Sequence, residues 1–88
     1  MQINKDFTIQ KVGGSYVAVP VGETSKHFHG MIRLNETGAF LWNQMVGTDK
    51  TEAALVDALL AEYDVSREIA ERDVHTVVTL LLENGIAL

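Results

Sequence analysis

The chain has 88 residues, 47% of them hydrophobic and 22% charged, a composition that predicts one soluble globular domain over residues 1–88. The absence of cysteine excludes disulfides, thiol catalysis and thiolate metal sites. The net charge of −5 lies mostly in residues 49–88, which carry three Lys or Arg and nine acids, against four and three in residues 1–48, and such an acidic half is a poor surface for DNA.

The first predicted element is a β-hairpin. Residues 7–11 and 15–19 alternate apolar and polar side chains as strands do, and Gly13-Gly14 between them supplies the positive φ values that tight hairpin turns require. Pro20 ends the second strand, because proline cannot donate a hydrogen bond to a ladder. Residues 21–29 form either a loop of moderate length or a prolongation of the hairpin.

A third strand, Met31 to Leu34, runs directly into a helix, because Asn35 is a typical N-cap residue. Nothing after Leu34 suggests a further strand, so we expect one edge of this strand to be uncovered. Proteins either suppress such an edge or use it to dock an extended peptide. We interpret it here as a docking site.

Three helices follow, and typical cap residues bound them: Glu36 to Val46 before Gly47, a second helix from the cap Thr51 to the break at 64–66, and Arg67 to Asn84 between Ser66 and Gly85. Phe40 and Trp42 in the first helix are expected core anchors. The second helix carries one apolar stripe, formed by Leu55, Val56, Leu59, Leu60 and Tyr63. Residues 86–88 remain as a short apolar tail, so the predicted order is β-β-β-α-α-α.

The third helix has an unusually wide apolar face. At 100° per residue its apolar side chains, from Ile69 to Leu82, span about 220°, whereas a stripe of ~100° suffices for packing on one core. Either the helix is central and touches the sheet and both other helices, or part of the arc lines a groove beside the third strand. Asp73 lies inside this arc, where it makes a local hydrogen bond, an ion pair with an arginine such as Arg33, or a contact with a bound peptide.

Signals for chemistry are weak. His27 and His29 could share a metal on a strand, but with no third ligand nearby we expect solvated loop histidines and no metal or cofactor. No Ser-His-Asp set, phosphate loop or nucleotide fingerprint occurs, so we do not expect an enzyme. No apolar run reaches the length of a signal peptide core or a transmembrane helix, and we expect a cytoplasmic protein.

Four short motifs together resemble one known family. They are Leu34-Asn-x-Thr-Gly-Ala-x-x-Trp42, Thr51-x-x-x-Leu55, Tyr63-Asp-Val, and Arg72-Asp-Val followed by Leu-Leu-Glu-Asn-Gly85-Ile. In this order, over about residues 7–88, they resemble the PqqD family. That family is named for a pyrroloquinoline quinone biosynthesis protein and is the model for the recognition elements of ribosomally made, modified peptides (RiPPs).

The resemblance implies an α+β, winged-helix-like fold in which a three-stranded antiparallel sheet is followed by a three-helix bundle. It also implies a non-catalytic role: such domains bind the leader of a ribosomally made precursor peptide and present it to a modifying enzyme, often a radical SAM enzyme. The leader adds as a strand to the edge of the third strand, in the cleft beside the third helix. Mapped onto this chain, the implied peptide-binding residues are Met31, Ile32, Arg33, Leu34, Asp73, Val74, Val77, Val78 and Leu81.

Two other functions are compatible with the sequence. A winged-helix outline also fits a DNA-binding protein, although the third helix carries only Arg67 and Arg72 among four acids. A bare dimerisation module would pair exposed strand edges between copies. Whichever function is right, we expect a monomer or a weak strand-paired dimer, because the edge of the third strand is open. We expect neither a nucleic acid nor a membrane as partner. The residues do not distinguish pyrroloquinoline quinone from another peptide product.

Overall fold

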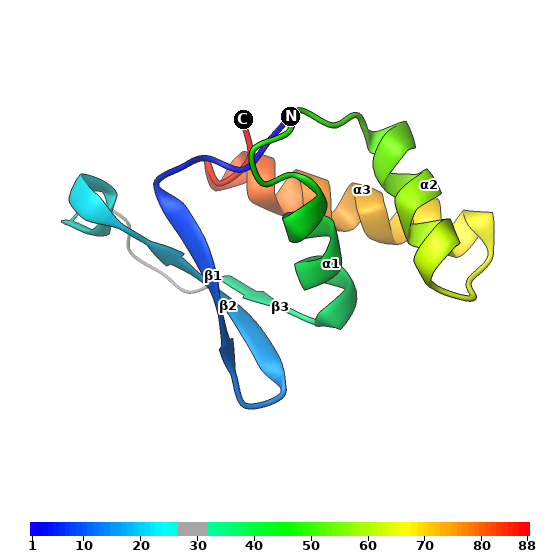
Figure 1. Ribbon diagram of the computed structural model, residues 1–88, viewed down its shortest axis with the longest axis horizontal. Helices are drawn as coiled ribbons and strands as arrows, with labels where there is room; N and C mark the ends of the chain where they lie inside the picture. Colours follow the sequence, from blue (N-terminus) through cyan, green and yellow to red (C-terminus); the bar gives the residue numbers. More distant parts are fainter. Residues whose placement is uncertain (27–31) are drawn as a thin grey trace.

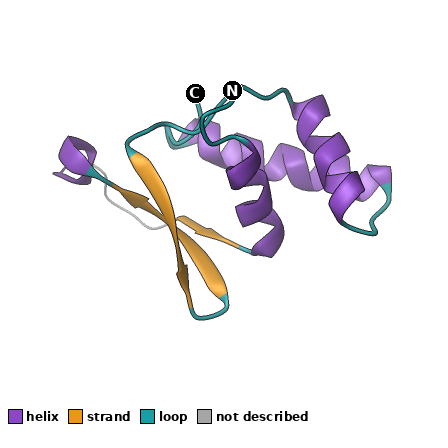
Figure 2. Ribbon diagram, in the orientation of Figure 1, coloured by secondary structure: helices purple, strands orange, loops and turns teal. Residues whose placement is uncertain are grey.

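An antiparallel sheet and three helices make up the computed structural model, which describes residues 1–26 and 32–88. The strands β1 (Phe7–Val12), β2 (Ser15–Pro20) and β3 (Ile32–Leu34) lie in the order β1-β2-β3. The helices α1 (Glu36–Gln44), α2 (Glu52–Glu62) and α3 (Arg67–Glu83) follow (Figure 1). Figure 2 shows the three helices gathered on one side of the hairpin. The predicted fold class and element order are confirmed.

The predicted boundaries need small corrections. α1 ends at Gln44 rather than Val46, because the Met45 N–H turns back to the Trp42 carbonyl at 2.9 Å and tightens the last turn. α3 ends at Glu83, with Asn84 as its C-cap. Each of the two strands of the hairpin extends one residue beyond its prediction.

The described part of the segment after β2 contains a short helix. Gly22–Lys26 form a short 3-10 helix, η1, which projects at the end of the molecule away from the three helices (Figure 2). The expectations for His27, His29 and Met31 fall outside the described residues.

One face of the sheet packs on the helices. Phe7, Ala18 and Leu34 are buried on this face, and Ile9, Tyr16 and Ile32 pack partly buried beside them. Trp42 is 1% exposed, which confirms it as a core anchor. None of the helices in the described part of the chain has both the length and the apolar character needed to cross a membrane.

Phe40 lies at the margin of this core instead of its centre. Its ring is half-buried and meets the ring of Tyr63 edge-on, with centroids 5.5 Å apart. Desolvation at this site, and after it the negative charges of Glu36 and Glu62, raise the pKa of the Tyr63 phenol. The cluster joins α1 to the end of α2.

The two ends of the chain pair with each other. Gln2 and Leu88 exchange backbone hydrogen bonds of 2.9 Å in both directions, and Ile3 forms a bridge with Ala87. Ile86 is completely buried. Ile86 and Ala87 of the apolar tail are therefore part of the core, whereas Leu88 is exposed.

Gly38 sets how closely α1 approaches β3. A Cβ at this position would lie 3.1 Å from Leu34 Cβ, and Leu34 is buried and has little room to move. We expect Gly38→Ala to lower the free energy of unfolding by about 1 kcal/mol, since overpacking outweighs the gain in helix propensity. Chemical denaturation measures this, with Gly14→Ala as control, because a Cβ at Gly14 meets nothing within 4 Å. A Gly38→Ala protein as stable as the control would contradict the expectation.

Candidate functional site

The strand β3 has a neighbour on one side only among the described residues, because the sheet order is β1-β2-β3. Hydrogen bonding alternates along antiparallel strands, so each residue directs both backbone groups to one side. The Val21 N–H donates to the Asp6 carbonyl at 2.8 Å, on the side of β1. Tyr16 and Ala18 lie an odd number of positions from Val21 in the chain. Their backbone groups are therefore directed to the opposite side of β2, toward β3.

This alternation identifies the backbone groups at the open edge. Tyr16 pairs with Leu34 and Ala18 with Ile32, so the backbone groups of Leu34 and Ile32 are directed at β2. Those of Arg33, between them, are directed at the open edge. An extended segment lying there could therefore bond to both the N–H and the C=O of Arg33.

The two edges of the sheet differ in how they are protected. On β1, Lys11 projects from the face that carries Phe7 and Ile9, and its Nζ lies 5.9 Å from the centroid of the Tyr16 ring. An inward-pointing charge on an edge strand is one device that prevents further strand pairing. The described residues of β3 place only Ile32 and Leu34 on this face. The edge of β3 is thus the less protected one.

On the flank that meets the start of α1, which directly follows β3, α3 presents a half-exposed strip that we call the α3 strip. Its members recur every three or four residues: Ile69, Asp73, Val77, Leu80 and Asn84. Val77 and Leu80 pack partly buried against the core, whereas Ile69 is 40% exposed. The strip occupies about 80° of the helix surface.

A cavity of about 150 Å³ connects the α3 strip to the end of β3. It is lined by Asn35 and Thr37, at the start of α1, and by Asp73, Thr76 and Val77 of α3. In Figure 1, β3 runs toward the start of α1 and α3 runs in the opposite direction. We call this space the Asp73 cavity.

Other predicted site residues lie in the core. Val74, Val78 and Leu81 are at most 1% exposed, so they hold α3 in place and offer no free surface in this conformation. Among the α3 residues singled out from the sequence, this leaves Asp73 and Val77 accessible. The wide apolar arc therefore has two parts, one packed on α1 and α2 and one that forms the α3 strip.

Asp73 makes an ion pair, one of the alternatives considered from the sequence, but its partner is not Arg33. Arg33 projects from the face of the sheet opposite to Ile32 and Leu34, away from the helices, because successive side chains of a strand point to opposite faces. The ion pair of Asp73 is instead with Arg72 Nε of its own helix, at 3.8 Å.

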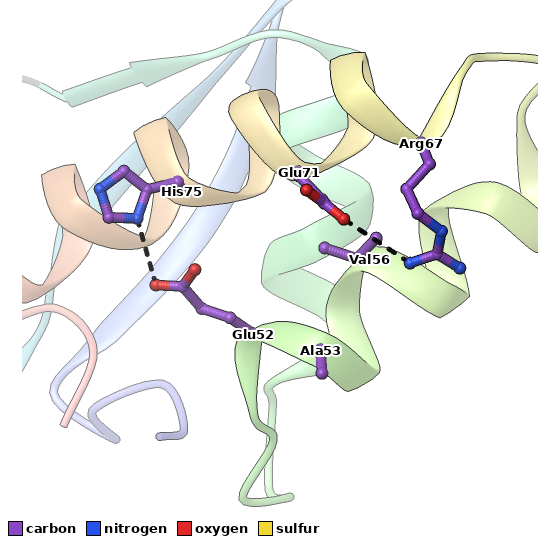
Figure 3. Close-up of a pocket in the computed structure, with 6 residues that line it drawn as sticks. All are labelled: Glu52, Ala53, Val56, Arg67, Glu71 and His75. Atoms are coloured by element: carbon purple, nitrogen blue, oxygen red, sulfur yellow. Dashed lines mark hydrogen bonds and ion pairs between the residues drawn. The ribbon is translucent and has the colours of Figure 1, made fainter.

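A second groove, of about 390 Å³, lies between α2 and α3, on the side of α3 away from the α3 strip. Figure 3 shows two contacts among its polar side chains: His75 Nδ1 lies 3.4 Å from Glu52 Oε1 across the groove, and Arg67 Nη1 lies 3.8 Å from Glu71 Oε1 within α3. These side chains are exposed, so such pairs contribute little to stability. Arg67 and Arg72 both contact acids, which disfavours a surface for nucleic acid phosphates. Among the described residues no group of three His, Asp or Glu could hold a metal ion.

Comparison with known proteins gives a consistent result. The family model described as coenzyme PQQ synthesis protein D (PqqD) matches residues 16–87. The structure of TbiB1 in complex with the TbiA(beta) leader peptide is similar, with 23% identity, a TM-score of 0.72, and coverage of 99% of this chain and 94% of that chain. That of lasso peptide synthetase B1 complexed with the leader peptide shows 28% identity, a TM-score of 0.70, and coverage of 99% and 95%. No curated protein matches this chain.

Proposed function

Because this chain belongs to the PqqD family, we propose that it is a non-catalytic recognition domain for the leader segment of a ribosomally made precursor peptide. The open edge of β3, together with the half-exposed α3 strip that meets the end of this strand at the Asp73 cavity, is the observation that carries this proposal. Both similar structures contain a leader peptide, which supports it.

The leader binds as an additional strand at the edge of β3. Its backbone bonds to the N–H and C=O of Arg33, and its side chains on the helix-facing side contact Ile32, Val77 and Leu80. Leu34 is buried beneath this contact and supports the strand from the core. Met31, which precedes β3 in the chain, is a further expected contact.

Apolar side chains supply most of the affinity. Each backbone hydrogen bond contributes about 0.5–1.5 kcal/mol net, whereas fixing each peptide residue costs about 1–2 kcal/mol. These two contributions nearly cancel. Burial of apolar surface, at about 25 cal/mol per Å², then gives several kcal/mol for a few hundred Å² against the α3 strip. The strand edge thus binds the peptide backbone whatever its sequence, and the α3 strip selects among peptides by their side chains.

The bound leader is presented to a modifying enzyme of the same pathway. A radical SAM enzyme is the first candidate from the family, and pyrroloquinoline quinone is one candidate product. The similarity to a lasso peptide synthetase component makes another peptide product equally compatible.

Isothermal titration with the leader of the precursor encoded beside this protein tests the proposal. We expect saturable one-to-one binding in the low micromolar range or tighter, about −8 kcal/mol. Double-stranded DNA at low ionic strength serves as the control, and we expect no binding to it. A folded protein that binds DNA in a salt-dependent way but no leader would contradict the proposed function.

A further inference from the structure

Asp73 places a weakly paired carboxylate within the α3 strip. Its side chain is 44% exposed, and its one ion pair in the described part of the chain is with Arg72, at 3.8 Å. Arg72 is 73% exposed, and adjacent residues of a helix project about 100° apart, so this contact does not hold the carboxylate firmly. Asp73 therefore keeps its capacity to accept hydrogen bonds from a ligand.

The other polar groups around the Asp73 cavity are uncharged and include both donors and acceptors. Thr76 Oγ1 donates its proton to the Arg72 carbonyl at 2.9 Å, which leaves its lone pairs available. Asn35 Oδ1 accepts the Gly38 N–H at 2.8 Å as the cap of α1. With the Thr37 hydroxyl, this lining carries one negative charge and no cation. A positively charged donor such as an ammonium or guanidinium group complements it.

The spacing of the site matches that of a bound strand. Asp73 and Val77 are one turn apart, about 6 Å along the helix axis. Side chains on the same face of a strand lie two residues apart, about 6.6 Å. A strand paired with β3 can therefore place one side chain on Val77 and its next same-face neighbour in the Asp73 cavity.

From these observations we infer that the Asp73 cavity receives a Lys or Arg side chain of the leader, two residues along the bound strand from the apolar side chain that packs on Val77 and Leu80. This inference rests on the proposed function and specifies its substrate. It assigns Asp73 as a specificity-determining residue.

Selection from a random peptide display library tests the inference without knowledge of the natural leader. Peptides are selected on the wild-type protein, on Asp73→Asn, and on Glu71→Gln, which changes an acid on the opposite flank of α3. We expect wild type and Glu71→Gln to enrich Lys or Arg two positions from an apolar residue. Asp73→Asn is expected to retain the apolar residue and to lose the cation.

Titration of the best selected peptide supplies the magnitude. We expect Asp73→Asn to weaken binding about fivefold, as for the loss of a half-exposed charge-assisted hydrogen bond. Replacement of the peptide cation by Gln should have the same effect. The two changes together should weaken binding little more than either one alone, because both remove the same interaction. Separate Lys and Arg peptides show which cation is preferred. Asp73→Lys should weaken binding of the cationic peptide and recover affinity with its Glu counterpart.

The outcomes distinguish a failure of the cation site from a failure of leader binding. Two results would overturn the inference and leave leader binding intact. In the first, the enriched peptides compete with one another for the wild-type protein but lack the cation. In the second, the cation is enriched on Asp73→Asn as well. If no peptide is enriched on the folded wild-type protein, the proposed function fails, and the inference fails with it.

Discussion

Val77→Asp is expected to weaken leader binding about 30-fold or more, because a carboxylate would be buried against an apolar peptide side chain at a cost of about 2 kcal/mol. Val77 lies in the middle of the α3 strip and lines the Asp73 cavity, so the new charge would also repel Asp73. Isothermal titration with the leader measures the loss.

The matched control is Leu82→Asp, on the same helix. Leu82 is an apolar residue 46% exposed, and it lies about 140° around the helix from Val77. We expect the leader affinity of this variant to equal that of wild type. Because Val77 also touches the core, the milder Val77→Thr keeps the test valid if the aspartate variant is unstable. Equal loss in both aspartate variants would mean that the α3 strip is not the binding surface.

Arg33→Pro is expected to weaken leader binding about tenfold or more while the domain stays folded. Proline removes the N–H that is directed at the open edge and places its ring in the path of an added strand. The fold tolerates it because this N–H does not bond to β2. Arg33→Ala, which keeps the N–H, is expected to bind the leader nearly as well as wild type.

Circular dichroism and thermal unfolding verify that both Arg33 variants are folded. If folded Arg33→Pro binds the leader as tightly as Arg33→Ala, the peptide does not pair with this edge.

Local chemistry made most of the fold predictable. The three predicted caps are present: Asn35, Thr51 and Ser66 each accept a backbone N–H from the residue three positions later, at 2.8, 3.1 and 3.2 Å. The hairpin turn has its positive φ at Gly13. Signals of this kind involve residues close in sequence, so a single sequence contains them.

Long-range pairing could not be predicted in the same way. The bridge between Ile3 and Ala87 joins the two ends of the chain, and neither segment is long or periodic enough to indicate a strand. The burial of Ile86 follows from that pairing. The sequence of a short apolar tail is the same whether the tail is exposed to solvent or packs in the core, so it does not indicate burial.

The candidate site was predictable in outline but not in its details. Helical periodicity places Val74 and Val77 on one apolar arc, yet only the packing of α1 and α2 decides that Val74 is buried and Val77 half-exposed. The ion pair considered for Asp73 is present, but its partner is Arg72 and not Arg33, because periodicity alone does not show which face of β3 meets the helices. The direction of a side chain depends on the register of a whole sheet.

Amide hydrogen exchange at Arg33, measured by NMR with and without the saturating leader, tests strand addition at β3 most directly. In the free protein the N–H of Arg33 should exchange faster than those of Ile32 and Leu34, because it faces the open edge and theirs bond to β2. Binding of the leader is predicted to slow exchange at Arg33 by about tenfold or more. If the leader saturates the protein and the Arg33 amide still exchanges at its free rate, the peptide does not add to β3, and the proposed mode of recognition is wrong.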